Sequence, residues 1–294
     1  MTEAAPGRTL GKAIAWTIAF IVVGLVLSAV AFFVLVALLG GDLGAEATNG
    51  GLVPGLSNAE ATLAQGLGFS FGFGLATLVV GVRAARLTWA DLRWRGTGAP
   101  LRSAALGFLI GGVASALAMA LAVPFGATWS RDGGSLLAWF GTAAGWLGVL
   151  LPAAFWEELA LRGVPLVLLA GAIGKVPASV LTAVAFGALH ANNPGATTLG
   201  VVNTGVAGLF LAAAFWAPGG IWTATGAHLG WNAVIATLDA PVSGIPFAMP
   251  FIDYHTAGPG WLTGGGFGPE GGLLATLTIL GATAAAVRWT RKGP

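Results

Sequence analysis

Three short segments of this hydrophobic chain carry side chains that can do acid–base chemistry. They read FWEELALR at residues 155–162, FGALH at 186–190 and HLGWN at 228–232. Each lies inside a long apolar run, where ionisable groups cost free energy and usually serve a function. The candidate catalytic residues are therefore Glu157, Glu158, Arg162, His190, His228 and Asn232.

Helical spacing predicts different roles for the two neighbouring glutamates. Glu158 and Arg162 stand four residues apart with the acid first, which favours an ion pair on one helix face. Glu157 is rotated by about 100° from Glu158, so we expect it to point away from that pair and to be available for chemistry. The same spacing of four puts His228 and Asn232 on one face of another helix.

Hydrolysis of a peptide bond is the chemistry that these groups support. A carboxylate and an imidazole that share a water can deprotonate it, and burial raises the pKa of a glutamate toward neutral pH. The attacking hydroxide would produce an oxyanion on the peptide carbonyl. The imidazole of His228 and the amide of Asn232 are donors suited to stabilise that charge.

A metal site is the competing interpretation of the same residues. Glu157, His190 and His228 would be three protein ligands that leave one position for water, as in catalytic zinc sites. The zinc protease motif HExxH is absent, because no histidine is followed by glutamate. The residues alone leave the metal-free and the zinc-dependent sites open.

Helical rise predicts that the acid and the first imidazole lie at the same depth. Glu157 is 13 residues before the end of its apolar run near residue 170, and His190 is 14 residues after residue 176. Both would lie about 20 Å from the same membrane face, and His228 would lie at about 14 Å. The sequence therefore allows Glu157, His190, His228 and Asn232 to meet.

The composition of the chain identifies it as a membrane protein. Of its 294 residues, 56% are apolar and 8% are charged, and the mean hydropathy is +0.85. Soluble domains carry about 25% charged residues, so a soluble enzyme is excluded and an all-α integral membrane protein is expected. The absence of cysteine excludes disulfides and thiol chemistry. The expected partners are membrane lipid and a peptide or membrane-associated protein, and no basic aromatic face indicates nucleic acid.

Eight apolar runs are long enough to be transmembrane helices, which need about 20 residues to cross about 30 Å of hydrocarbon. We expect one membrane domain over residues 1–294, built from helices at 13–39, 60–82, 102–124, 136–170, 176–193, 196–216, 219–238 and 271–289. The fourth run is too long for a simple crossing. It therefore predicts a segment that begins before the membrane near Ser135, or a strong tilt.

The positive charges predict that both termini are cytoplasmic. Cytoplasmic loops carry an excess of Lys and Arg, and an N-in, C-in bundle puts eleven of the thirteen cations inside: Arg8, Lys12, Arg83, Arg86, Arg93, Arg95, Arg102, Lys175, Arg288, Arg291 and Lys292. Arg131 and Arg162 are the exceptions. The first run is longer than the apolar core of a secretory signal, so we expect it to stay as a helix.

Two further features bear on packing. Three glycine pairs, 68/72, 107/111 and 141/145, have the spacing that lets helices approach closely. The segment 240–272 is rich in Gly and Pro, which suits a loop on the outer face or an interfacial lid, and we expect an ordinary ordered connector. It contains His255, for which we expect no direct role in chemistry.

The three polar segments resemble the motifs of the CPBP family of intramembrane proteases, which includes CAAX prenyl endopeptidases and bacteriocin-processing proteins. EELALR at 157–162 is similar to the family's EExxxR, FGALH at 186–190 to its FxxxH, and HLGWN at 228–232 to its HxxxN/D. The resemblance covers residues 133–239, the expected catalytic core, and the helix count is similar over the whole chain.

The resemblance implies an intramembrane endopeptidase and a role for each residue. Glu157 and His190 would activate water, His228 and Asn232 would form the oxyanion site, and Glu158 and Arg162 would form a structural pair with some catalytic support from Glu158. Members have been called metalloproteases, but the site also resembles a metal-free glutamate-dependent hydrolase. We favour the metal-free site, with zinc as the alternative cofactor.

The resemblance also limits what can be said of the substrate. Eukaryotic members cut prenylated CAAX tails, whereas prokaryotic relatives are linked to peptide maturation and bacteriocin self-immunity. The Ala- and Gly-rich composition is typical of a prokaryotic chain, so we expect the prokaryotic cytoplasmic membrane and no prenylated substrate.

The rival function is a non-catalytic membrane peptide-binding protein or transporter, with a role of the bacteriocin-immunity type. A transporter would be expected to show repeated halves with broken helices, and no such symmetry is visible in the sequence. The retention of both Glu157 and His190 favours the protease.

Overall fold

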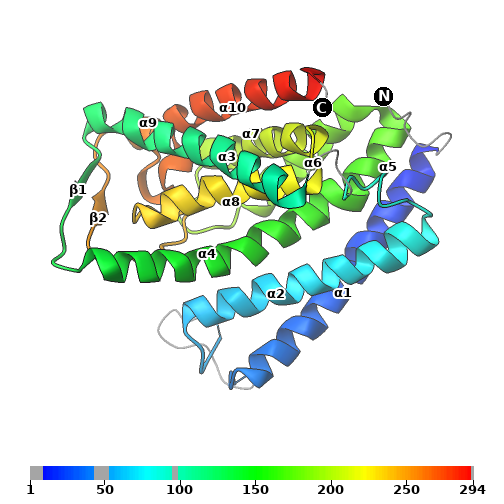
Figure 1. Ribbon diagram of the computed structural model, residues 1–294, viewed down its shortest axis with the longest axis horizontal. Coiled ribbons are helices and arrows are strands. Elements are labelled where there is room, and N and C mark those ends of the chain that lie inside the picture. Colours follow the sequence, from blue (N-terminus) through cyan, green and yellow to red (C-terminus); the bar gives the residue numbers. More distant parts are fainter. Residues whose placement is uncertain (1–8, 43–52, 95–98, 293–294) are drawn as a thin grey trace. The chain divides into compact units, whose positions relative to one another are not determined.

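The computed structural model describes residues 9–42, 53–94 and 99–292 (Figure 1). Within these ranges the regular secondary structure is helical apart from two strands of three residues and one isolated bridge between Val242 and Ile245. Arg8, Arg95 and the side chain of Lys292, which the charge pattern assigns to the cytoplasm, lie outside what is described.

Each of the eight predicted segments corresponds to helical structure. The helices are α1 (Leu10–Leu38), α2 (Asn58–Ala76) with the π-helical η1 (Thr77–Ala84), α3 (Pro100–Ala122) with the 3₁₀ turn η2 (Val123–Phe125), α4 (Leu136–Glu158), the π-helical η3 (Leu159–Gly163), α5 (Val164–Ile173), α6 (Lys175–Leu189), α7 (Thr198–Trp216), α8 (Ile221–Thr237) and α10 (Leu273–Lys292). The expectation of an all-α membrane protein is confirmed.

Among the described residues, six helices are long and apolar enough to cross a membrane. The remaining two predicted spans are shorter, since α6 has 15 residues and α8 has 17. At the rise of an α-helix they extend over about 23 and 26 Å, less than the roughly 30 Å of hydrocarbon. The count of eight crossings and the N-in, C-in topology therefore stay predictions. The two short helices are the ones associated with His190 and His228.

Contacts between residues divide the chain into two compact units. The first contains residues 1–94 and 148–178, and the second contains residues 95–147 and 179–294. The boundaries fall inside α4 and α6, so each of these helices begins in one unit and ends in the other. The expected single membrane domain and its core at 133–239 stay predictions.

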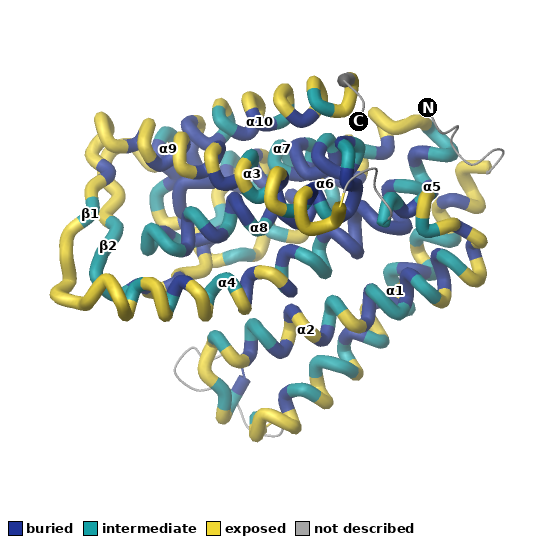
Figure 2. Tube along the Cα trace, in the orientation of Figure 1, coloured by how far each residue is buried: buried dark blue, intermediate teal, exposed yellow. Residues whose placement is uncertain are grey.

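In the first unit, α1 packs against α2 and α5. The ring of Phe73 lies 5.6 Å from Phe20 of α1 and is stacked at 6.0 Å on Trp156 of α4. Gly68 and Gly72 lie against the α1 backbone, where a Cβ would overlap its atoms, so this predicted close contact is confirmed. Only five of the 29 residues of α1 are buried, as is usual for a lipid-facing helix (Figure 2).

The fourth apolar run begins where the sequence predicts and contains a change of helix type. The Oγ of Ser135 accepts a hydrogen bond from the Ala138 amide, and α4 starts at the residue after Ser135. Helical structure continues to Ile173, but residues 159–163 form a π-helical turn. Such turns, with hydrogen bonds from i to i+5, are rare and frequent at functional sites.

In the second unit, α8 packs against α3 through glycines on both helices. A Cβ at Gly107 or Gly111 of α3 would overlap backbone atoms of α8, and a Cβ at Gly226 or Gly230 of α8 would overlap the carbonyls of α3. The expected close contact at 107/111 is therefore confirmed. The expectation for 141/145 is wrong, because a Cβ at either glycine would meet nothing within 4 Å.

The segment 240–272 is ordered and packs on the second unit. Strand β1 (Thr128–Ser130) pairs antiparallel with β2 (Asp253–His255), followed by α9 (Gly260–Thr263) and the 3₁₀ turns η4 (Gly265–Phe267) and η5 (Pro269–Gly271). The carboxylate of Asp239, just after α8, accepts hydrogen bonds from the amides of Met249 and Tyr254. The indoles of Trp139 and Trp129 donate to the carbonyls that end α8, at Thr237 and Leu238.

Candidate active site

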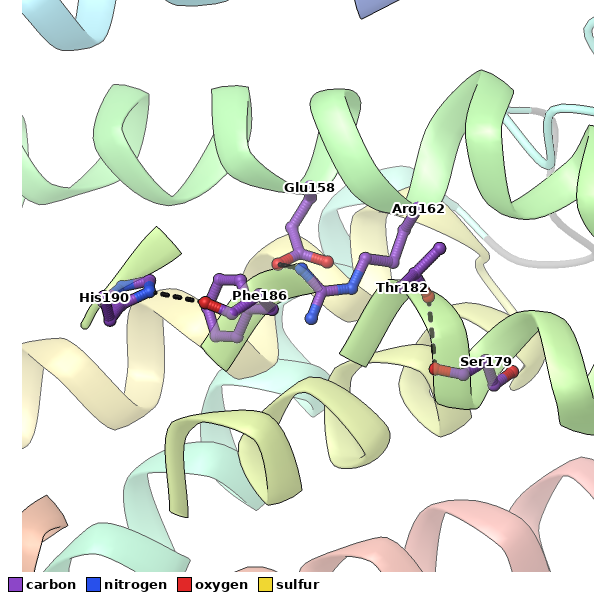
Figure 3. Close-up of polar contacts among 6 residues, drawn as sticks. All are labelled: Glu158, Arg162, Ser179, Thr182, Phe186 and His190. Atoms are coloured by element: carbon purple, nitrogen blue, oxygen red, sulfur yellow. Dashed lines mark hydrogen bonds and ion pairs between the residues drawn. The ribbon is translucent and has the colours of Figure 1, made fainter. Parts of the chain in front are cut away.

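The first unit contains the predicted ion pair. Arg162 Nη1 lies 3.2 Å from Glu158 Oε1, and both side chains are fully buried (Figure 3). A buried pair is costly to desolvate and strongly destabilising to break. Glu158 and Arg162 therefore hold each other in place on the segment that also carries Glu157.

Glu157 is half-buried next to this pair, and its electrostatic environment differs from the expectation. The guanidinium of Arg162 interacts electrostatically with Glu157 as well as with Glu158. The helical rotation of 100° assumed for a regular α-helix ends at Glu158, because residues 159–163 form a π-helical turn. Arg162 follows Glu157 by five residues, which is the spacing of one π-turn. The carboxylate of Glu157 is thus coupled to the pair rather than separate from it.

Aromatic rings fix the rotation of this end of α4. Trp156 lies edge-on to Phe69 with ring centroids 4.9 Å apart, and Phe155 lies edge-on to Trp94 at 6.1 Å. Both contacts fall on the residues directly before Glu157. Because neighbouring side chains point in fixed directions around a helix, these contacts also set the direction of the glutamate.

The second unit contains His190, the first residue after α6. Its Nδ1 lies 2.8 Å from the carbonyl oxygen of Phe186, as drawn in Figure 3. A carbonyl oxygen can only accept, so Nδ1 carries the hydrogen and the neutral ring presents Nε2 as an acceptor. A hydrogen bond of this kind from Nδ1 to backbone is the usual way in which a protein fixes the tautomer of a functional histidine.

Phe186 also contacts the second histidine. Its ring lies 4.7 Å from the His190 ring and 5.7 Å from the His228 ring, edge-on at 85° to the latter. His228 lies in α8 and is 7% exposed. The structure therefore brings both imidazoles into contact with one phenyl ring.

Asn232 lies on the same face of α8 as His228, one helical turn further along. It is half-buried. The structure thus groups Glu157, Glu158 and Arg162 in the first unit. In the second unit it groups His190 and His228 around Phe186, with Asn232 on the helix face of His228.

No group of three or more His, Cys, Asp or Glu side chains is placed to hold a metal ion within residues 9–42, 53–94 and 99–292. The zinc alternative with Glu157, His190 and His228 as ligands stays a prediction.

Two further sequence features concern possible site residues. Residues 68–72 read GFSFG, which fits the pattern GxSxG, but a nucleophilic serine of that motif needs a turn between strand and helix. Ser70 instead lies within α2 and donates to the carbonyl of Pro152 at 3.0 Å. His255 lies in β2, exposed, with Nε2 2.7 Å from Ser130 Oγ.

One buried carboxylate was missed by the motifs. Glu270 in η5 is 9% exposed and accepts a hydrogen bond at 2.7 Å from the indole of Trp231, which lies inside the HLGWN segment. The two residues are 39 positions apart, so no local spacing in the sequence could reveal the contact.

A comparison with known protein families finds a match, in the middle of the chain. Residues 138–234 match the family described as Rce1-like, type II CAAX prenyl endopeptidase. The match includes all three polar segments and supports a CAAX-protease-like intramembrane endopeptidase in general. Searches of curated proteins and of solved structures gave no significant match.

Proposed function

We propose that this chain, whose residues 138–234 match the Rce1-like family of type II CAAX prenyl endopeptidases, hydrolyses a peptide bond with a water activated by Glu157 and His190. The observation that carries the proposal is the hydrogen bond from His190 Nδ1 to the Phe186 carbonyl. It fixes the tautomer in which Nε2 can accept a proton from water.

The proposed reaction begins when a water lies between the Glu157 carboxylate and His190 Nε2. One of these groups takes a proton from the water, and the oxygen forms a bond to the carbonyl carbon of the substrate. The tetrahedral intermediate carries a negative charge on the former carbonyl oxygen. When it collapses, the C–N bond breaks and the proton is transferred to the leaving amine.

His228 and Asn232 are proposed to donate hydrogen bonds to the oxyanion. Their position on one face of α8, one turn apart, would let both donors reach a single oxygen. Removing one donor of an oxyanion site costs about 10²–10³ in kcat. Their proposed role therefore predicts a large effect on turnover and a small effect on substrate binding.

Glu158 and Arg162 are proposed to support catalysis by holding Glu157. The guanidinium interacts electrostatically with both carboxylates, so it offsets the repulsion between the two neighbouring acids.

The proposed substrate is a peptide or membrane-associated protein, cut in the prokaryotic cytoplasmic membrane. The six apolar helices place the chain in a membrane. Because the two helices associated with the histidines are short, the bilayer would have to thin around them or water would have to reach their ends. Either arrangement would bring water toward the proposed site.

The test is turnover by purified protein in lipid nanodiscs, with an internally quenched farnesylated peptide that ends in a CAAX sequence and the same peptide without the lipid as probes. Glu157→Gln and His190→Ala should each lower kcat by about 10²–10⁴. The matched control is His255→Ala, an exposed histidine outside the site, which should keep the wild-type rate.

Three results would change the proposal. Wild-type turnover by Glu157→Gln would remove the proposed mechanism. Loss of activity with a chelator and recovery with zinc would favour the metal-dependent alternative. Binding of both peptides without cleavage by the wild-type chain would favour a non-catalytic peptide-binding protein.

A further inference from the structure

Glu270 is a buried carboxylate that the proposed mechanism does not use. It lies in η5 of the second unit and is 9% exposed. Its Oε1 accepts from Trp231 Nε1 at 2.7 Å, and its Oε2 accepts from Ser243 Oγ at 2.9 Å and from the Ser243 backbone amide. Three donors thus converge on one acidic side chain.

The first donor connects Glu270 to the HLGWN segment. Trp231 follows His228 by three residues, precedes Asn232 directly, and is 5% exposed. Because side chains project from a helix in fixed directions, a hydrogen bond that fixes the Trp231 indole also fixes the rotation of α8. The directions of His228 and Asn232 follow from that rotation.

The second partner connects Glu270 to the FGALH segment. While Ser243 donates twice to Glu270, its own carbonyl accepts a hydrogen bond from Asn193 Nδ2 at 3.0 Å. Asn193 lies in the turn after α6, and its backbone amide donates to the carbonyl of His190 at 3.2 Å. A chain of hydrogen bonds therefore extends from the turn of His190 to the helix of His228.

Glu270 itself is held by two other helices. Asn203 of α7 is buried, and its Nδ2 donates to the carbonyls of Glu270 and Gly272 at 2.8 and 2.9 Å. Its Oδ1 accepts from Thr276 Oγ1 of α10 at 2.6 Å. The carboxylate is therefore a fixed point against which both histidine segments are positioned.

The charge of Glu270 suits this task better than a neutral side chain would. A carboxylate has only acceptors, so both oxygens can receive the three donors, and hydrogen bonds to a charged acceptor are about twice as strong as neutral ones. An amide in its place would direct an N–H group at another donor. Glu270→Gln therefore keeps the volume but removes at least one of the bonds.

We propose that Glu270 is a positioning residue that sets the location of His190 relative to His228 and Asn232. The inference rests on the proposed function for its effect on catalysis. The effect of Glu270 on the positions of the FGALH and HLGWN segments does not depend on that function and can be tested without measuring turnover.

The experiment compares Glu270→Gln with wild type in nanodiscs, using whichever of the two quenched peptides, farnesylated or unlipidated, the wild-type chain cleaves. Because Glu270 does not touch the substrate in this account, kcat should fall tenfold or more, while KM should stay within about twofold. Ser243→Ala removes one of the three donors and should give an intermediate kcat.

The matched control is Asp239→Asn. Asp239 also holds the segment 240–272 through two backbone amides, but it has no bond to Trp231 or Ser243 among the described contacts. We expect wild-type kcat for this variant. Equal losses in Asp239→Asn and Glu270→Gln would show that loosening the segment is sufficient and would overturn the positioning role.

A second readout is nuclear magnetic resonance of ¹⁵N-labelled histidine side chains, since the chain contains three histidines. In Glu270→Gln the signals of His190 and His228 should shift or broaden, and that of His255 should not. Trp231→Phe, which removes the indole donor together with part of the ring volume, should move the His228 signal and serves if Glu270 variants fail to fold.

The two proposals fail in different ways. Full turnover by Glu157→Gln would end the proposed function, whereas the histidine signals would still report on Glu270. Wild-type kcat together with unchanged His190 and His228 signals in Glu270→Gln would overturn the positioning role and leave the proposed function in place.

Discussion

The ring of Phe186 lies edge-on to the ring of His228, with centroids 5.7 Å apart and an angle of 85°. The same phenyl ring contacts His190, and the carbonyl of the same residue accepts from His190 Nδ1. The first residue of the FGALH segment therefore fixes the tautomer of one histidine and packs against the other. Phe186 therefore belongs to the candidate active site as well as to the hydrophobic core.

Phe186→Leu should lower turnover without unfolding the protein. Leucine fills most of the volume but offers no ring for either imidazole, so we expect kcat to fall about tenfold with little change in KM. Phe186→Ala leaves a cavity as well, which costs about 3–5 kcal/mol of unfolding free energy. Steady-state kinetics and chemical unfolding measure the two effects. Phe71→Leu, at a side chain that is 63% exposed, is the control and should change neither quantity.

Arg162→Leu should be strongly destabilising, because it leaves the carboxylate of Glu158 buried without its cation. We expect a loss of about 3–5 kcal/mol in the unfolding free energy. Glu158→Leu combined with Arg162→Leu removes both charges and should recover most of that stability, although not the activity. Unfolding in mixed detergent micelles measures these differences, and Arg291→Gln on the exposed end of α10 should stay within about 0.5 kcal/mol. A double variant as unstable as the single one would contradict the account of the pair.

Much of the fold follows from local patterns in the sequence. Each of the eight apolar runs corresponds to helical structure, and the ion pair follows from the spacing of Glu158 and Arg162. These features depend on hydrophobic length and on neighbours within one helical turn. They could therefore be predicted without knowledge of tertiary packing.

The structural features that the sequence did not predict leave no local pattern, and most of them depend on residues far apart in the chain. A helix of regular period would separate Glu157 from Arg162, and the π-turn at 159–163 that couples them is not visible in composition. Strands β1 and β2 have three residues each, too few to show an alternating pattern. The bond between Trp231 and Glu270 joins positions 39 residues apart. Such contacts arise only when the helices pack.

Gly230→Ala should disturb the contact between α3 and α8. The added Cβ would overlap the carbonyl of Phe108, so the helices must separate, and such overpacking costs about 1–3 kcal/mol. His228 lies on the same helix, and turnover should fall as well. Gly281→Ala in α10 is the matched control, since its Cβ would meet nothing within 4 Å. We expect it to be neutral or to stabilise by up to about 1 kcal/mol.

Tyr254 should titrate above its ordinary range. Burial raises the pKa of this phenol, and the nearby side chain of Thr256 opposes the shift only in part. The pKa of Tyr254 is higher in the folded state than in the unfolded state. Its contribution to the free energy of unfolding is therefore fully present below the unfolded pKa of about 10 and is lost as the pH rises through the folded pKa. The chain has one tyrosine, so tyrosinate absorbance reports on this residue alone. A midpoint at or below 10 would contradict the burial of Tyr254 beside Trp129.

The central claim is that Glu157 and His190 share one water, and a chain without cysteine allows a direct test. Glu157→Cys and His190→Cys are introduced together, and the protein in nanodiscs is treated with a short-spacer bis-methanethiosulfonate. The account predicts an intramolecular cross-link, detected by mass, in the double variant and none in either single-cysteine variant. Failure of the 157/190 pair to cross-link, when each single cysteine reacts with the reagent, would contradict the claim.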